Sequence, residues 1–169
     1  YAPLRDMLRA ALGRAGGIRI DHIIGLFRLW WIPQGAGADQ GTYVRYDAEA
    51  IVGIVALEAQ RAGAVVIGED LGVVEPSVRT VLAERGILGT SILWFEWEND
   101  QPMPPEHYRQ LCLATVTTHD LPPSSGYLQL EHVAIRDQLG LLTRSVEDER
   151  AHELVAIDKV LATLEARGL

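Results

Sequence analysis

The 169 residues suffice for one domain with a substantial hydrophobic core, and 48% hydrophobic with 22% charged residues are typical of soluble globular proteins. A net charge of −8, with arginines scattered among acidic residues, argues against a nucleic-acid partner. No stretch approaches the roughly 18 apolar residues of a membrane span, so we predict no membrane partner. The single cysteine, Cys112, excludes an internal disulfide and favours a cytoplasmic location.

The N-terminal part of the chain predicts a helix, a strand and a long irregular segment, in that order. The helix covers about the first seventeen residues, and the pair Gly16-Gly17 ends it. A β-branched strand follows over 17–21, and residues 25–46 predict a functional loop rich in aromatic residues. The buried face of the helix is expected to contain Leu4, Met7, Leu8, Ala11 and Leu12.

The next helix is predicted from an N-cap at Asp47 to about Arg61, with Gly63 closing it. Its buried side is expected to contain Ile51, Ile54, Val55 and Leu57. The remaining elements are predicted as a strand over 64–68, a helix from Pro76 to Gly86, a strand over 87–95, a short helix over 105–110, a strand over 113–118, and mainly helix after Pro123 with a break near Gly140.

This alternation of helices with buried apolar strands predicts the α/β class with parallel strands. Four strands are expected in total. They fit either an open, doubly wound sheet or half of a (β/α)₈ barrel. Periodicity alone leaves both architectures open.

Three acidic residues each follow one of the predicted strands: Asp21, Glu69 and Asp120. In parallel α/β folds the carboxyl ends of the strands meet at the edge where ligands bind. A single carboxylate there more often caps the following helix than it catalyses a reaction. Three carboxylates at one edge favour a catalytic site.

The order of the strands suggests which carboxylates are paired. The strands before Asp21 and Glu69 are consecutive and should be neighbours about 4.8 Å apart. Their carboxyl groups then approach the roughly 5–5.5 Å separation of a retaining glycosidase. Arg19 should point the same way as Asp21 and keep it ionised, as a nucleophile requires. The adjacent Asp70 and partial burial favour protonated Glu69, as a general acid requires.

His119 precedes Asp120 and can donate a hydrogen bond to a sugar hydroxyl. For Arg19 the alternative is a purely structural ion pair, and for His119 it is a buried, hydrogen-bonded imidazole. Both alternatives remain open from the sequence.

Five motifs, in this order and spacing, resemble those of the amylomaltases: RIDHIIGLFRLWWIP, TYVRYDAEA, VIGEDLG, ILGTSILWFEWE and TTHDLP. Amylomaltases are disproportionating 4-α-glucanotransferases, glycoside hydrolase family 77 of the α-amylase-like clan of retaining (β/α)₈ enzymes. The resemblance extends from about Tyr1 to Leu130. One departure is the sequence LPPSSGY after His119-Asp120, so no role is transferred to that loop.

The resemblance implies that Asp21 is the catalytic nucleophile with Arg19 as its partner. It also implies that Glu69 is the general acid/base and Asp120 the third carboxylate, with His119 beside it. The implied fold is a partial TIM barrel containing about strands 4–7 with their helices. Residues 1–169 are then one fragment of the catalytic barrel, from its central to C-terminal part. The parent chain is expected to be longer at both ends.

The implied reaction is a double displacement that transfers α-1,4-glucan segments between maltooligosaccharides. The remaining predicted substrate-binding residues are Asp70, Trp30 and Tyr43. Adjacent aromatic residues of an extended segment point in opposite directions, so at most one of Trp30 and Trp31 should face the site. No cofactor is expected, and the dispersed histidines and carboxylates predict no metal site.

Two other functions remain open from the sequence. A retaining hydrolase of the same clan would use the same carboxylates and favour water as the acceptor. A non-catalytic glucan-binding fragment is the second alternative. Because four strands do not close a barrel, we expect little activity from these residues without the rest of the parent chain.

Overall fold

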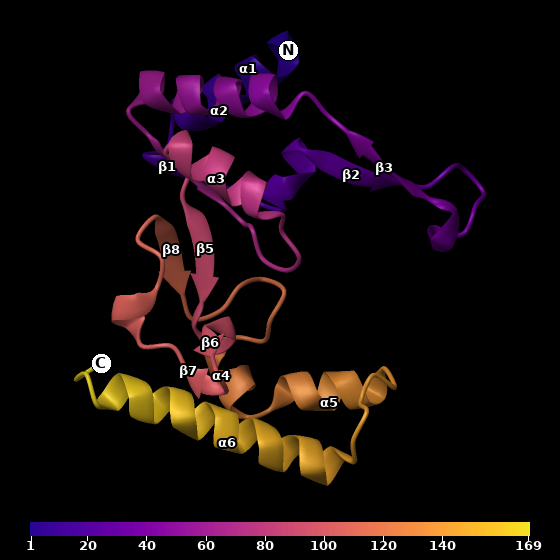
Figure 1. Ribbon diagram of the computed structural model, residues 1–169, viewed down its shortest axis with the longest axis vertical. Helices are drawn as coiled ribbons and strands as arrows, with labels where there is room; N and C mark the ends of the chain where they lie inside the picture. Colours follow the sequence, from indigo (N-terminus) through magenta and orange to yellow (C-terminus); the bar gives the residue numbers. More distant parts are fainter. The chain divides into compact units, whose positions relative to one another are not determined.

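The computed structural model describes residues 1–169 and divides them into two compact units. The N-terminal unit comprises residues 1–90 and 111–113, and the C-terminal unit comprises residues 91–110 and 114–169. The chain passes from one unit to the other within two paired strands, β5 (Gly89–Ile92) and β8 (Cys112–Thr115) (Figure 1).

The sheet of the N-terminal unit begins with β1 (Gly17–Ile20) and β4 (Val65–Gly68), which pair in parallel. A parallel bridge between Ile67 and Leu88 then joins β4 to the segment that leads into β5. The N–H of Gly89 donates to the carbonyl of Leu111 at 2.9 Å, just before β8. The predicted strands are therefore neighbours in chain order. The prediction of an α/β fold with parallel strand pairs is confirmed, but the strands do not form a closed barrel.

Three helices accompany these strands: α1 (Ala2–Leu12), α2 (Ala48–Ala62) and α3 (Pro76–Glu84). Helix α2 has the predicted ends, because the side chain of Asp47 accepts from Ala50 N at 3.2 Å and Gly63 has a φ of 62°. Each fully buried Val, Leu or Ile contributes roughly 1.5–3 kcal/mol to stability. The core includes Leu8, Leu12, Ile23, Val52, Val55, Val66, Val78, Leu82 and Ile87.

Some details of the predicted helices are wrong. Helix α1 ends at Leu12 with Gly13 as its C-cap, earlier than predicted. Met7 is 61% exposed, because the buried stripe of α1 follows positions four residues apart, Leu8 and Leu12. Leu57 is likewise 44% exposed, beside the buried Glu58.

The segment predicted as a loop is an antiparallel hairpin instead. Strand β2 (Arg28–Trp31) pairs with β3 (Thr42–Arg45) after a 3₁₀ turn at Ile23–Leu26. A second 3₁₀ turn, Ala38–Gln40, lies between the two strands. The hairpin projects away from the helices of its own unit (Figure 1). Aromatic residues favour the strands. Of the residues that suggested irregular structure, Gly25 lies in the first 3₁₀ turn, and Pro33, Gly35, Gly37 and Gly41 lie in the connection between the strands.

The C-terminal unit is mainly helical after Pro123, as predicted, and Gly140 has the positive φ expected of a break. The predicted strand over 87–95 and the predicted helix over 105–110 are both shorter in the structure. The C-terminal unit contains the 3₁₀ turns Leu93–Phe95 and Pro105–His107 and the paired short strands β6 (Trp97–Glu98) and β7 (Gln101–Pro102). Its helices are α4 (Ser124–Leu128), α5 (Glu131–Gln138) and α6 (Val146–Glu165).

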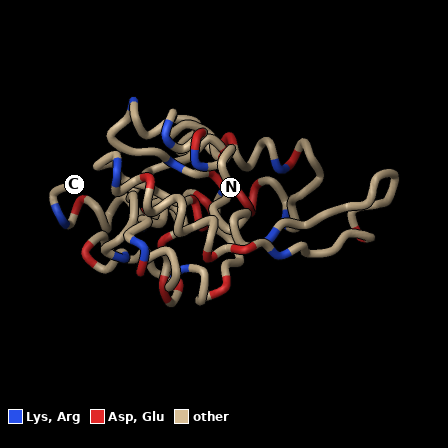
Figure 2. The backbone as a smooth tube through the Cα atoms, turned by 90° about the horizontal axis from the view of Figure 1, so that it is seen from above, with Lys and Arg blue, Asp and Glu red and all other residues tan.

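Charged residues stabilise this unit and are scattered along the whole chain (Figure 2). The buried carboxylate of Glu149 accepts from Arg136 at 2.8 Å, and Ser145 caps α6 by accepting from Asp148 N at 3.1 Å. Lys and Arg are interspersed with Asp and Glu along the chain, as expected from the sequence (Figure 2). None of the helices has the length and apolar character that crossing a membrane requires.

Candidate active site

Glu69 follows the last residue of β4 and is hydrogen-bonded to the end of β1. Its N–H donates to the carbonyl of Ile20 at 2.9 Å, and its own carbonyl accepts from Ile23 N at 2.8 Å. Its carboxylate accepts two further backbone N–H groups, from His22 at 2.9 Å and from Leu71 at 2.7 Å. The side chain is thus held at the carboxyl end of β1 and β4, where the sequence predicted it.

Asp21 lies at the same edge, directly after β1. Since Ile20 pairs with Gly68 in the parallel register, Asp21 and Glu69 are the next residues on neighbouring strands. The side chain of Asp21 is 56% exposed, and its Oδ1 lies 2.7 Å from Nη1 of Arg19. The predicted approach of Arg19 to Asp21 is present, because residues two apart on a strand share a face.

His22 was not predicted as part of the site. It adopts a left-handed conformation, with a φ of 47°, and this turn presents its N–H to Glu69. A non-glycine residue rarely takes this conformation, although histidine does so more often than most. No pattern in the sequence indicates such a turn.

The glycine before Glu69 makes this arrangement possible. A Cβ on Gly68 would lie 2.8 Å from Cγ1 of Ile23, which is fully buried. Such contacts are too short for real side chains. Gly68 therefore allows the turn at His22 and Ile23 to approach β4 closely enough to bind Glu69.

Asp70 does not lie where a substrate-binding residue was expected. Its side chain is 1% exposed, its Oδ1 accepts from Thr90 N at 3.0 Å and its Oδ2 lies 3.4 Å from Nε of Arg79. Adjacent residues of an extended segment face opposite ways, so Asp70 points into the unit while Glu69 remains at the edge. The structure gives Asp70 a role in joining β4 to the start of β5.

Asp120 and His119 belong to the C-terminal unit, whereas Asp21 and Glu69 belong to the N-terminal one. Asp120 follows β8 after a short turn, and its N–H donates to Oγ1 of Thr118 at 3.3 Å. Nε2 of His119 lies 3.5 Å from Oδ1 of Asp120, and both side chains are exposed. His119 is thus not the buried imidazole considered as the alternative.

The aromatic residues of the hairpin lie on its two faces. Trp30 is paired with Tyr43 across the strands, and their rings meet edge to face with centroids 5.0 Å apart. The guanidinium of Arg28 lies 4.3 Å from the Tyr43 ring centroid. On the other face Nε1 of Trp31 donates to the hydroxyl of Tyr46 at 2.7 Å. As predicted, Trp30 and Trp31 point in opposite directions.

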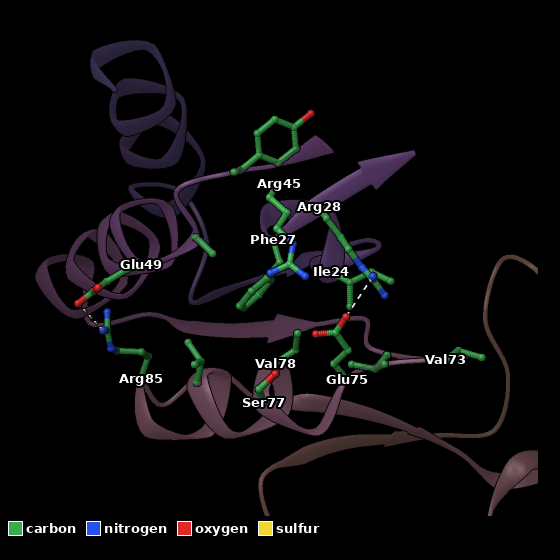
Figure 3. Close-up of a pocket in the computed structure, with 14 residues that line it drawn as sticks. Ile24, Phe27, Arg28, Arg45, Glu49, Val73, Glu75, Ser77, Val78 and Arg85 are labelled. Carbon is green, nitrogen blue, oxygen red and sulfur yellow. Dashed lines mark ion pairs between the residues drawn. The ribbon is translucent and has the colours of Figure 1, made fainter. Parts of the chain in front are cut away.

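A cleft of about 490 Å³ lies at the base of this hairpin, lined also by the first residues of α2 and by α3 (Figure 3). Arg28 forms an ion pair with Glu75 at 3.0 Å, and Arg85 lies 3.9 Å from Glu49. Neither predicted catalytic carboxylate of this unit lines the cleft. The Arg28–Glu75 pair therefore fixes the hairpin to the start of α3, outside the carboxylate edge.

Comparison with known proteins gives consistent matches. A family model described as 4-alpha-glucanotransferase matches residues 1–166. A 4-alpha-glucanotransferase of Mycobacterium bovis is 63% identical over 154 residues, which cover 88% of this chain and 21% of the relative. Another, of Haemophilus influenzae, is 37% identical over 155 residues, which cover 92% of this chain and 22% of the relative. The chain thus spans about a fifth of the length of these relatives.

Solved structures give the same result. The amylomaltase from Corynebacterium glutamicum matches with a TM-score of 0.91 and 51% identity, over 99% of this chain and 24% of that one. The amylomaltase from Streptococcus agalactiae, solved in complex with acarbose, matches with a TM-score of 0.62 and 19% identity. That match covers 83% of this chain and 30% of the other, and its low identity shows similarity of fold alone.

Proposed function

Because this chain belongs to the 4-alpha-glucanotransferase family, we propose that the protein transfers α-1,4-glucan segments between maltooligosaccharides. The observation that supports the proposal most directly is the position of Asp21 and Glu69 at the ends of paired parallel strands. The N–H of the residue after Asp21 binds the carboxylate of Glu69. Two carboxylates on adjacent strand ends suit the short separation of a retaining mechanism.

In the first half of the proposed reaction, Asp21 attacks the anomeric carbon and the glycosidic bond breaks. Glu69 gives its proton to the departing glycosidic oxygen, so the products are a glucosyl ester of Asp21 and a shortened glucan. Nη1 of Arg19 lies 2.7 Å from Oδ1 of Asp21 and holds the carboxylate in place for this attack.

In the second half, Glu69 accepts a proton from the 4-hydroxyl of a new glucan. That oxygen attacks the anomeric carbon, and the ester bond to Asp21 breaks with inversion at that carbon, as in the first half. A second inversion at the same carbon restores the original anomer. Transfer exceeds hydrolysis when the glucan occupies the acceptor position more effectively than water does.

We propose that Asp120 and His119 bind ring hydroxyls of the reacting glucose. Their place in the TTHD motif supports this, because the family model matches residues 1–166, which include it. In a barrel the ends of successive parallel strands converge on one face. On this proposal the strands β1, β4, β5 and β8 correspond to about strands 4–7 of a (β/α)₈ barrel.

The hairpin supplies aromatic surface for the glucan in this proposal. Trp30 is 45% exposed and Tyr43 54% exposed, so a sugar ring can reach both. The edge-to-face contact between the two rings holds them in a fixed arrangement. The cytoplasmic location remains a prediction.

Incubation of the intact protein with maltotriose tests the proposed function. Glucose together with maltooligosaccharides longer than maltotriose is the expected product pattern. Glucose and maltose without longer products would identify a hydrolase. The absence of any product, with sugar binding retained, would identify a glucan-binding protein.

A further inference from the structure

The C-terminal unit contains a cavity of about 560 Å³, a volume within the range of small-molecule sites. The aromatic side chains of Trp94, Trp97 and Tyr127 line it together with Glu153 and Lys159. Lys159 is the only lysine in the chain. The wall therefore combines flat apolar rings with hydrogen-bond donors and acceptors.

Tyr127 is held between two other rings. Its ring is nearly parallel to that of Trp94, with centroids 4.4 Å apart, and to that of His132, with centroids 4.1 Å apart. Two rings at these distances cannot share one face of the tyrosine, so both faces are covered. What Tyr127 contributes to the cavity is the rim of its ring, which carries the hydroxyl.

Trp94 lies beside Tyr127 in the cavity wall and is only 8% exposed, and its buried Nε1 has no hydrogen-bond partner in the structure. Burial and the nearby carboxylate of Glu153 raise the pKa of Tyr127 to about 12. The hydroxyl therefore remains a donor at neutral pH. Because a buried N–H without a partner is unfavourable, a ligand oxygen in the cavity would supply the contact that Nε1 of Trp94 lacks.

Trp97 offers an aromatic ring face to the cavity, whereas the rings of Tyr127 and Trp94 stack on each other. Its Nε1 donates to the carbonyl of Trp94 at 3.1 Å, which fixes the ring, and it stacks on no other ring. Glu153 and Lys159 oppose each other in charge. These features suit a neutral ligand with several hydroxyl groups and an apolar ring face.

From this geometry we infer that the cavity is a second carbohydrate site. It binds a glucosyl unit of an α-1,4-glucan, with the sugar ring against Trp97 and a sugar hydroxyl on Tyr127. The choice of a glucan rests on the proposed function. None of the predicted catalytic carboxylates lines the cavity, so a glucan is held there without being cleaved.

Calorimetric titration of the intact protein with maltoheptaose, in an Asp21→Ala background that prevents turnover, counts the sites. We expect two sites per chain. Tyr127→Phe keeps the ring stack and removes the hydroxyl, so it should weaken one of them roughly tenfold. Trp97→Ala should weaken the same site. The matched control is Tyr1→Phe, which removes an exposed hydroxyl that bonds Asp47 and should change neither site.

A single site, or two sites that neither Tyr127→Phe nor Trp97→Ala weakens, overturns the inference. Melting temperatures show whether each variant folds, and Trp97→Ala decides the question if Tyr127→Phe does not. The wild-type protein is assayed in parallel for transfer on maltotriose. If the wild type transfers glucan but calorimetry finds one binding site, the inference about the cavity is wrong and the proposed function stands. If calorimetry finds two sites but the wild type shows no transfer, the proposed function is wrong and the cavity site stands.

Discussion

The backbone N–H of His22 donates to Oε2 of Glu69 at 2.9 Å. His22 directly follows Asp21, so the turn after one predicted catalytic carboxylate holds the other. The same turn is fixed by Ile23, whose N–H donates to the carbonyl of Glu69 at 2.8 Å. A change in this turn should therefore affect both carboxylates at once.

Gly68→Ala should disturb this turn. The added methyl group would lie 2.8 Å from Ile23, a fully buried residue that has no room to move. We expect a loss of roughly 1–3 kcal/mol in the free energy of unfolding and a large loss of transfer activity. Gly16→Ala is the control, because a methyl group there meets nothing within 4 Å. Equal stability and activity of the two variants, measured by urea unfolding and product assay, would contradict this account.

Arg19→Ala should lower activity far more than stability. The Arg19–Asp21 pair is largely exposed, and such pairs contribute about 0–1 kcal/mol to folding. The charge next to the proposed nucleophile should nevertheless change kcat/KM by roughly tenfold to a hundredfold. Arg5→Ala removes a similarly exposed pair, with Asp6 at 2.8 Å, and should leave kcat/KM unchanged. Unaltered kcat/KM in Arg19→Ala would reduce the pair to a structural one.

Trp30→Ala should raise the KM for maltotriose several-fold while the melting temperature changes little. The substitution removes a half-exposed ring and its contact with Tyr43. Contacts between aromatic rings contribute about 0.5–1.5 kcal/mol beyond the area that they bury. Val73→Ala, at a position that is 94% exposed, is the control for loss of an exposed apolar side chain. An unchanged KM in Trp30→Ala would remove the hairpin from the substrate site.

Glu58 should make the stability of the protein depend on acid pH. The hydrogen bond from Arg9 lowers the pKa of the Glu58 carboxyl below 4.5; burial opposes this shift and Arg61 adds to it. The folded state therefore holds the ionised form more tightly than the unfolded state. This contribution to stability is present above the ordinary pKa and is lost as the pH falls through the lower, folded-state value.

Urea unfolding of wild type and Glu58→Gln between about pH 7 and pH 3 measures this contribution. The wild type should be the more stable protein at neutral pH, and the difference should shrink as the medium becomes acidic. Glu49→Gln, at an exposed carboxylate 3.9 Å from Arg85, is the control. A difference between wild type and Glu58→Gln that is constant across this range would contradict the assignment.

Much of the fold followed from local sequence patterns. Asp47 and Gly63 mark both ends of α2 because a capping carboxylate and a left-handed glycine act on their immediate neighbours. The strand before Glu69 was predicted correctly because a continuous apolar run is typical of a strand buried in a parallel sheet. The hairpin of β2 and β3 was missed because its pairing depends on contacts across a connection with glycines and Pro33.

The site was predicted less completely than the fold. The position of Glu69 was predictable, but its bonds to His22 and Leu71 depend on a turn without a sequence signature. Asp70 was assigned to the substrate, although the alternation of side chains along an extended segment already indicated that it faces away from Glu69. The unpartnered Nε1 of Trp94, whose ring stacks on Tyr127, depends on packing between distant segments, which no local pattern encodes.

In the proposed double displacement, Asp21 forms a covalent bond to the sugar while Glu69 serves as acid and base. Mass spectrometry of the intact Glu69→Gln protein, incubated with an α-maltosyl fluoride, detects that bond. Fluoride leaves without the help of an acid, so the maltosyl ester of Asp21 should form. It should then accumulate because no base activates the acceptor.

We expect the added maltosyl mass on the peptide that contains Asp21, and none in an Asp21→Ala, Glu69→Gln double variant. Attachment to another carboxylate would contradict the account. So would the absence of any adduct from a folded Glu69→Gln protein whose wild-type form transfers glucan.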